Sequence, residues 1–394
     1  MSGLLGLEPD VVRAAAQSVR PTELTDADEA AEVFARGSWT GIAEPGDGVA
    51  GALVATYGAA EALSRVQEGD LAGRPDLRDG QERWRPRLDT DVAQRAFHNA
   101  SRLGMRLLLP GDPDWPRGMD DLGPHAPLAL WCLGGPAPLG AVARSIALVG
   151  ARAATGYGER VATEAACGLV DRGFAIVSGA AYGIDGTAHR AALASGGVTV
   201  AVLAGGLDRF YPSGHAQLLA RIAREGAVLS ELPCGAAPTK WRFLQRNRLI
   251  AAMTRATVVL EAGARSGSLN TAGHAAALAR PLGAVPGSVF SATSAGCHRL
   301  LREYDAVCVR DAADMAELAG DSDGQVPLDG LEQHDELERR ALDALGGRAR
   351  PALEVARSAG ISLGDALSAL GMLSLTGAAE ETPAGWLRRR PRGA

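Results

Sequence analysis

Lysine is almost absent from this sequence: Lys240 is the only one, so nearly all of its 40 basic residues are arginines. We attribute this bias mainly to genomic base composition. Aromatic residues are also scarce, at 4%, and the formal net charge of −6 argues weakly against a nucleic-acid partner. Charges are screened beyond roughly 8 Å at physiological salt, so a local basic groove still attracts phosphate on an acidic protein. Local charge therefore matters more than the total.

The sequence also lacks paired cysteines and long apolar runs. The five cysteines are odd in number, are scattered and form no C-x-x-C pair, which excludes a disulfide framework and a zinc site of the usual spacing. The residues after Met1 show no basic flank followed by an apolar core, so we predict no signal peptide. No stretch approaches the roughly 18 uncharged apolar residues that span a membrane. We expect a cytoplasmic protein without membrane contact, metal or cofactor.

The 394 residues suggest two or three domains. Helical spacing of apolar residues over Glu29–Phe34 and Ala50–Val66 indicates a small helical domain, which with its linker takes residues 1–80. Gln67–Arg87 is rich in Gly, Pro, Arg and acids and resembles a linker or mobile loop.

Residues 81–320 show a regular alternation of short apolar runs with segments long enough for helices. This alternation predicts an α/β fold with a doubly wound, mostly parallel sheet covered by helices on both faces. The expected main strands are Ser145–Val149, Ala175–Ser178, Thr199–Leu203, Ala227–Ser230, Thr257–Glu261, Leu282–Val285 and Ala306–Val309, preceded by shorter runs at Arg106–Leu109 and Leu128–Leu133.

The C-terminal part reads as a separate small domain. A polar linker is expected over residues 321–332. Residues 333–394 then show three short helical patterns, beginning near Glu332, Pro351 and Ser362, followed by a hairpin. Three helices and a terminal hairpin predict a winged-helix domain.

Ligands bind open parallel sheets at the carboxyl ends of the strands, so the loops there are the candidate site. The first main strand is followed by Gly150 and Arg152 and then by a helix. A glycine-rich turn at a helix start suits an anion, although the glycine equally suits a tight turn. The second ends in Ser178-Gly179, with Asp185 and His189 four residues apart on a probable helix. We expect Asp185 to cap that helix and His189 to pack, rather than to hold a metal or act as a catalytic pair.

The strongest local signal is the segment from Lys240 to Arg248, which has four cations, two aromatics and no acid. Guanidinium groups pair with phosphates, while aromatic faces stack on bases. The alternative is a helix start whose Phe243 enters the core. No acid within the segment neutralises the cations, which favours a binding role.

Two further strand-end loops are rich in small polar residues. Arg265–Ala272 offers Ser, Gly and Thr donors at a helix start, and Pro286-Gly287-Ser288 forms another small-residue turn. Together the loops place anion donors on one rim. The predicted DNA- or phosphate-binding residues are Gly150, Arg152, Ser178, Gly179, Lys240, Arg242, Phe243, Arg246, Asn247, Arg248, Ser266, Gly267, Ser268, Thr271 and Gly287.

From about Gly104 to Asp311 the chain resembles the DprA/Smf family of DNA-processing proteins. The motifs that carry the resemblance are VGARAATGYG, SGAAYGIDGTAH, AGGLDRFYP, SELPCG, FLQRNRLIAAMT, EAGARSGSLNTA and PGSV, in matching order and spacing. The resemblance implies an extended Rossmann-like domain that binds single-stranded DNA without hydrolysing nucleotides. It also implies a homodimer that protects incoming strands and loads the recombinase RecA during natural transformation and recombination.

The resemblance assigns the family's G-x-R arginine to Arg152 and its basic segment to Phe243–Arg248. There are departures: Leu244 replaces the usual proline, Gln245 stands where a lysine can occur, and Trp241 is an added aromatic. For the dimer, our candidate face is Leu300, Leu301 and Tyr304.

Two other functions remain open at this stage. A nucleotide-binding enzyme resembling phosphoribohydrolases needs a glutamate on the helix after the Ser266–Thr271 loop, and that helix has none. The nearest carboxylate, Glu261, precedes the loop, and we expect it to pair with Arg246 or Arg248. A DNA-binding regulator would read bases through Ser362–Leu373, but this segment has no Lys or Arg. We favour a protein-contact or structural role for it.

Overall fold

The computed structural model describes residues 3–69, 75–321 and 329–389. The chain divides into two compact units, Met1–Asp321 and Ser322–Ala394. The predicted boundary near residue 80 does not coincide with this division, because the N-terminal helices and the sheet belong to the same unit.

The first unit is built on a nine-stranded sheet of order β1-β2-β6-β5-β4-β3-β7-β8-β9. Strands β3 to β9 run parallel to their neighbours within this set, and β2 is antiparallel to both β1 and β6. The bounds are β1 Arg106–Leu108, β2 Leu130–Gly134, β3 Ser145–Gly150, β4 Ala175–Ser178, β5 Thr199–Leu203, β6 Ala227–Ser230, β7 Ala256–Glu261, β8 Leu282–Ala284 and β9 Val307–Cys308. The predicted fold class is confirmed. Short apolar strands can bury both of their faces only in a sheet that helices cover on both sides.

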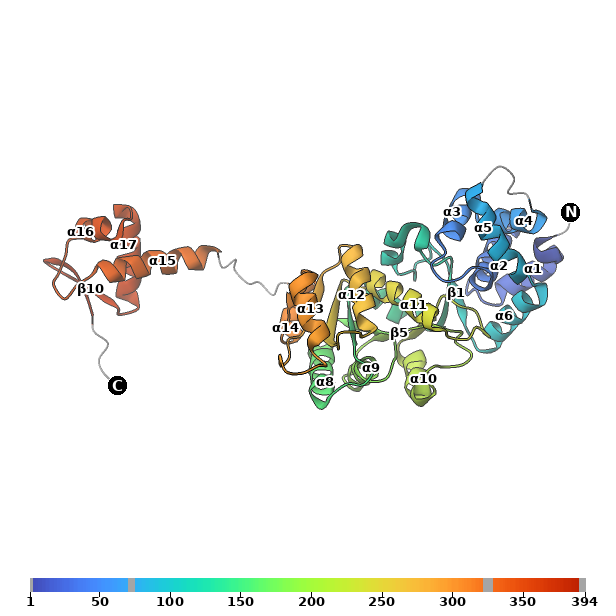
Figure 1. Cartoon of the computed structure of the whole chain (residues 1–394). Coiled ribbons are helices and arrows are strands. Elements are labelled where there is room, and N and C mark those ends of the chain that lie inside the picture. The colour runs from blue at the N-terminus through green and yellow to red at the C-terminus, as the bar shows by residue number, and fades with distance from the viewer. Residues whose placement is uncertain (1–2, 70–74, 322–328, 390–394) are drawn as a thin grey trace. The chain divides into compact units, whose positions relative to one another are not determined.

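Helices cover both faces of the sheet (Figure 1). One face carries α8 (Gly156–Asp171), α9 (Ile184–Ala194) and α10 (Ala216–Glu225), and α14 (Ala312–Leu318) packs with α8. The other face carries α11 (Lys240–Met253), α12 (Ser268–Ala277) and α13 (Ala295–Glu303). Short α7 (Pro136–Gly140) precedes β3. Alternate residues of the central strands, such as Ile146 and Ala147 of β3, enter cores on opposite faces of the sheet, as a pleated sheet requires.

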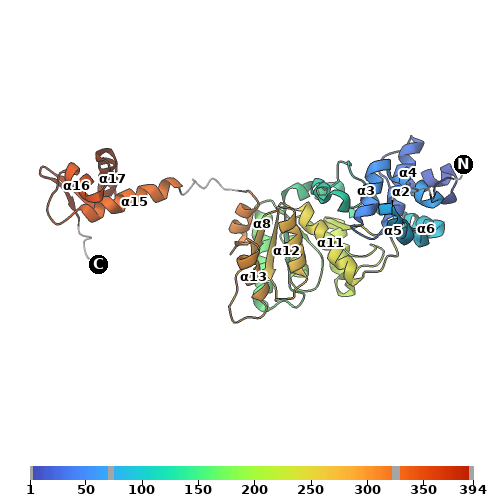
Figure 2. The same cartoon turned by 45° about the horizontal axis from the view of Figure 1, so that its top comes forward.

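The N-terminal residues form six helices that lie at the β1 end of the sheet (Figures 1 and 2). Their bounds are α1 Pro9–Gln17, α2 Ala27–Ile42, α3 Gly48–Tyr57, α4 Ala59–Glu68, α5 Pro75–Trp84 and α6 Thr90–Arg102. The helical spacing over Ala50–Val66 is interrupted at Gly58, whose φ of 80° ends α3 and begins α4.

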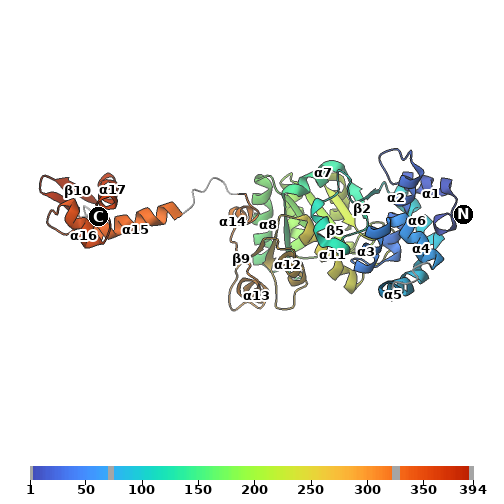
Figure 3. The same ribbon diagram turned by 90° about the horizontal axis from the view of Figure 1, so that it is seen from above.

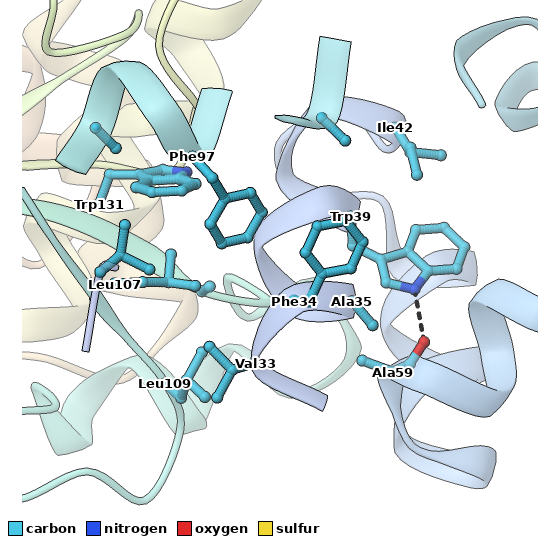
Figure 4. Close-up of a cluster of buried hydrophobic side chains, with 14 of the residues drawn as sticks. Val33, Phe34, Ala35, Trp39, Ile42, Ala59, Phe97, Leu107, Leu109 and Trp131 are labelled. Atoms are coloured by element: carbon cyan, nitrogen blue, oxygen red, sulfur yellow. Dashed lines mark hydrogen bonds between the residues drawn. The ribbon is translucent and has the colours of Figure 1, made fainter. Parts of the chain in front are cut away.

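One hydrophobic core joins these helices to the sheet (Figure 4). The ring of Phe97 stacks on Phe34 at 5.1 Å between centroids and meets Trp131 of β2 edge-on at 5.5 Å. Trp39 donates its indole N–H to the carbonyl of Ala59. Aromatic contacts of this geometry add to the burial of apolar area, so the N-terminal helices and the sheet stabilise one another.

The prediction of a linker over Gln67–Arg87 is wrong for residues 75–87. This segment contains α5 and a 3-10 turn at Arg85–Arg87. Its anchor is Trp84, which is 1% exposed, packs edge-on against Trp39 and donates its indole N–H to Asp47. Together with Leu77, which is buried in the same core, this ring holds a segment whose composition is otherwise that of a loop. Composition alone does not reveal it. Residues 70–74 lie outside the described part.

The second unit contains α15 (Asp329–Ala344), α16 (Ala352–Ala359) and α17 (Leu363–Leu375), followed by the hairpin of β10 (Ala379–Thr382) and β11 (Gly385–Arg388). The three helices and the terminal hairpin match the expected elements, and the winged-helix assignment itself stays a prediction. Most of the predicted linker 321–332 falls on residues outside the described part. Figure 3 shows the fold of each unit from above.

Among the described residues, no single helix is both long enough and apolar enough to cross a membrane, and α16 and α17 meet that test only as a bent pair.

We predict that Phe97→Ala destabilises the first unit by roughly 3–5 kcal/mol, because it removes a buried ring that joins two parts of the core. Val92→Ala is the matched control on the same helix: Val92 is 48% exposed, and its loss should change stability by less than about 0.5 kcal/mol. Urea unfolding followed by tryptophan fluorescence measures both. Equal midpoints for the two variants would show that the helices do not stabilise the sheet.

Candidate nucleic-acid interface

A large cleft lies where the winding of the sheet reverses. From β3 the chain builds β4, β5 and β6 in one direction and then returns to place β7 on the other side of β3. The loops after β3 and β7 therefore diverge, and such switch points are the usual ligand sites of open α/β sheets. The cleft has a volume of about 1040 Å³ and is lined by Gly150–Ala153, by Gly263–Ser268 and by the first half of α11.

Three exposed cations line this cleft: Arg152 after β3, Lys240 at the start of α11 and Arg265 after β7. Among the residues that the structure describes, none of the three forms an ion pair. Surface charges without an acidic partner produce a local positive potential even on an acidic protein. The structure therefore brings together Arg152 and Lys240 as predicted, and it adds Arg265, which the sequence analysis left out of the site.

A fourth cation, Arg246, lies under the cleft and is 5% exposed. Its Nη1 donates to the carbonyl of Val202, and its Nε has no partner. Burial lowers the pKa of Arg246 to about 10, which leaves it charged at neutral pH, while the carboxylate of Asp185 opposes that shift. Burial also raises the pKa of Asp185. Each charge thus offsets part of the desolvation of the other in a poorly solvated place.

Gly179 makes room for this guanidinium. A Cβ at residue 179 would lie 2.0 Å from Nη1 of Arg246, so any other residue there would displace the guanidinium. The Gly179 N–H donates to Asp185 at 3.2 Å, and the Ala181 N–H donates to the same oxygen at 3.4 Å. Gly179 therefore supports Arg246 and Asp185 rather than facing the cleft.

Phe243 provides an aromatic surface in the cleft. The guanidinium of Arg152 lies 5.0 Å from its ring centroid, and the ring of Tyr211 lies 5.7 Å away at 55°. Tyr211 is 51% exposed, and it was missed because it follows β5 in a motif that we did not connect with the site. Cations held beside accessible aromatic faces suit a ligand that carries both phosphates and flat bases.

The opposite wall consists of small polar groups around the start of α12. The hydroxyls of Ser266 and Ser268 lie 2.8 Å apart. Asn247 on α11 donates to Asn270 at 3.1 Å, which ties the two helices together. Ser266, Gly267, Ser268, Asn247 and Thr271 all line the cleft as predicted. Backbone N–H groups and hydroxyls at a helix start suit an anion.

Two of the predicted cations point elsewhere. Arg248 is 3% exposed and forms a two-bond ion pair with Glu231 at 2.8 and 2.7 Å. Arg242 pairs in the same manner with Glu44, after α2, at 3.0 and 2.9 Å. This bond, helped by Arg87, lowers the pKa of Glu44. Neither arginine lines the cleft, because residues two apart on a helix face different directions.

Glu261 does not pair with Arg246 or Arg248, contrary to our expectation. Its carboxylate accepts from the N–H of Thr155 at 2.9 Å and from the hydroxyl at 2.6 Å. Gly150 lines the cleft, but its place is also fixed by packing, since a Cβ there would lie 2.5 Å from Ile184. Ser178 is fully buried and donates to the carbonyl of Leu148. Gly287 lines a second, neighbouring pocket.

The Asp185 and His189 pair has structural roles. His189 packs as expected: it is buried and hydrogen-bonded to Thr199, and burial lowers its pKa to about 3, so it stays neutral. Asp185 does not cap α9, whose N-cap is Gly183, but binds the preceding turn. Within the described residues, no three His, Cys, Asp or Glu side chains form a group that would hold a metal ion.

Comparisons with known proteins agree with this geometry. The family model of DNA recombination-mediator protein A matches residues 106–320. A protein of Mycobacterium tuberculosis strain H37Rv that carries the name DNA processing protein DprA is 45% identical over 362 residues, which is 88% of this chain and 91% of that protein. The DNA processing protein DprA of Streptococcus pneumoniae R6 is 44% identical over 158 residues, 40% of this chain and 56% of its own length.

The solved structures include a relative with the same architecture. The X-ray structure of DprA from Streptococcus pneumoniae superposes with a TM-score of 0.61 at 30% identity, covering 73% of this chain and 97% of that one. The family model covers the whole sheet and both loops that form the cleft. The chain therefore belongs to the DNA recombination-mediator protein A family, also called DprA.

Proposed function

We propose that the cleft binds single-stranded DNA and that the protein acts as a recombination mediator, protecting incoming strands and loading RecA during natural transformation. The observation that carries the DNA proposal is the meeting of three exposed, unpaired cations with the faces of Phe243 and Tyr211 in one cleft. Cations bind the sugar-phosphate backbone, and aromatic faces stack on bases of any identity. The loading of RecA is supported by family membership.

The alternative function, a nucleotide-hydrolysing enzyme, is less well supported by the side chains. Helix α12 carries no carboxylate along Ser268–Ala277. Glu261 lines the neighbouring pocket and is bound to Thr155. Asp185 lines the cleft, but it is buried and accepts hydrogen bonds from the N–H groups of Gly179 and Ala181. An assay of nucleotide monophosphate hydrolysis separates the two functions, because only the enzyme would release a base.

For the second unit we propose a protein-contact role rather than the reading of DNA bases. Helix α17 has no Lys or Arg, and it exposes Leu363, Leu367 and Leu375. Base edges in the major groove are read by hydrogen-bonding side chains, above all Arg, Lys, Asn and Gln.

We predict tighter binding to a single strand than to a blunt duplex, with little dependence on sequence. The reason is that a duplex hides the base faces that Phe243 and Tyr211 would contact. A competition assay with a hairpin-free oligonucleotide and its duplex measures the preference. Equal affinities would contradict the proposal.

We predict that Arg152→Ala weakens single-strand binding and reduces the slope of log K against log salt by about 0.7, because one phosphate contact is lost. Its stability should change by less than about 0.5 kcal/mol, because the side chain is exposed. Fluorescence anisotropy across a salt series, with urea unfolding, measures both. A folded Arg152→Ala protein with wild-type affinity and salt slope would remove this site.

Arg248→Ala is the matched comparison from α11. It leaves Glu231 buried without its partner, so it should cost roughly 3–5 kcal/mol of stability. Under conditions in which the variant is folded, however, Arg248→Ala should keep the wild-type slope of log K against log salt, because Arg248 touches no phosphate in this proposal. A reduced slope in the folded Arg248→Ala protein would mean that the cleft boundary is wrong.

We also propose a homodimer. Its contact face differs from the one that the sequence analysis named, Leu300, Leu301 and Tyr304. Leu300 was predicted to lie on that face, but it is 1% exposed and packs into the core under α13. Tyr304 and Val307 are exposed nearby, at 39% and 51%. We predict a dimer at micromolar concentration by light scattering and a shift to monomer in Tyr304→Arg, since an added charge would have to be desolvated. A wild-type monomer would rule out the dimer.

A further inference from the structure

A second pocket of about 610 Å³ opens beside the cleft, at the carboxyl ends of β7 and β8. Its walls are the hydroxyl side chains of Thr155, Ser288, Ser291 and Ser294, together with Tyr157 and Glu261. Tyr157 donates its hydroxyl proton to the carbonyl of Pro286 at 2.6 Å, which joins the start of α8 to the loop after β8. Its ring remains 48% exposed.

The chemistry of this pocket differs from that of the cleft. Among its described lining residues none is a cation, and Glu261 contributes a carboxylate. A carboxylate repels phosphate but accepts hydrogen bonds from the amino groups of bases. Serine and threonine hydroxyls both donate and accept, as the polar edge of a base requires. The pocket therefore suits a neutral, flat heterocycle better than the anion expected from the Pro286-Gly287-Ser288 turn.

Between Ser288 and Ser291, which both line the pocket, the chain carries an exposed aromatic ring. Phe290 is 96% exposed and Val289 is 79% exposed. The N–H of Phe290 donates to the hydroxyl of Ser288 at 3.3 Å, so the backbone beneath the ring is tied to the pocket wall. A side chain presented this fully to water has no role in the core, so its ring is free to stack on a base.

The pocket and the cleft share a wall. Ser291 lines the pocket, and the next residue in the chain, Ala292, lines the cleft. They also lie over neighbouring strands, β7 and β8, which pair in parallel and are spaced about 4.8 Å apart. A strand bound in the cleft therefore needs only its adjacent nucleotide to reach the pocket.

We propose that this pocket binds a base of the same DNA strand whose backbone lies in the cleft, with the ring of Phe290 stacking on that base. The inference rests on the proposed function and adds a base-binding subsite to it. The charges of the two sites differ accordingly. The cleft with Arg152, Lys240 and Arg265 binds the phosphates, and the pocket, which has no cation among its described lining residues, binds the heterocycle.

The test uses the full chain and two ligands, a thymidine oligonucleotide and an abasic chain of equal length that has the sugar-phosphate backbone only. Phe290→Ala should weaken binding of the thymidine oligonucleotide about tenfold, which is within the range for one stacked base. It should leave binding of the abasic chain unchanged. Phe290→Trp should restore binding, because it keeps a stacking surface. Tyr57→Ala, which removes a partly exposed ring on α3, is the control and should match wild type.

The outcomes separate the two proposals. Arg152→Ala should weaken binding of both ligands, because both carry phosphates. If Arg152→Ala weakens binding and Phe290→Ala does not, the subsite is overturned and the cleft stands. An equal loss on both ligands in Phe290→Ala would also overturn the subsite, since the ring would then act on the backbone. If neither variant changes binding, the proposed function at this cleft fails as well.

Discussion

The guanidinium of Arg246 is buried beneath the cleft, where an uncompensated charge would be costly. The charge of Asp185 offsets part of that cost, and the carbonyl of Val202 accepts a hydrogen bond from Nη1 of Arg246. These contacts require Gly179, because a side chain there would occupy the space of the guanidinium. The ring of Phe243 lies between Arg246 and Arg152, at 5.8 and 5.0 Å. The surface that we assign to DNA, Arg152 and the ring of Phe243, therefore depends on the buried guanidinium of Arg246.

Helix α11 connects this arrangement to the rest of the protein. One face contributes Lys240, Phe243 and Asn247 to the cleft. The other face is held by the ion pairs of Arg242 with Glu44 and of Arg248 with Glu231. Glu44 follows α2, so the N-terminal helices help to fix the orientation of α11. Because both pairs are two-bond contacts of arginine with a carboxylate, they fix direction as well as distance.

The sequence was sufficient for the fold, because buried parallel strands leave an almost continuous apolar signal. It was also sufficient to place Arg152 and the Ser266–Thr271 loop at the cleft, since both follow directly from the position of a strand end. It failed for Arg242 and Arg248, whose acidic partners lie 198 and 17 residues away along the chain. The absence of an acidic residue within one helix does not show that no acidic residue from another element contacts it.

The same limit applies to the segment that ends at Trp84. Its composition is that of a loop, and one indole ring placed against Trp39 makes it part of the core. Pairing across the fold is a property of tertiary structure, which a local pattern does not contain. Tyr211 was missed for a related reason. It follows β5, and its ring reaches Phe243 because α11 packs against β5.

The ion pairs also explain how a chain of net charge −6 presents a positive cleft. Carboxylates are paired with arginines where the fold needs a fixed contact, as in Arg248 with Glu231 and Arg20 with Asp112. Such pairs contribute almost no field at a distance, because the opposite charges cancel. The field at the cleft then comes mainly from the exposed cations without an ion pair there, Arg152, Lys240 and Arg265, with a contribution from the buried Arg246, over the short range that salt permits. An acidic total charge and an attractive surface for a polyanion are therefore compatible.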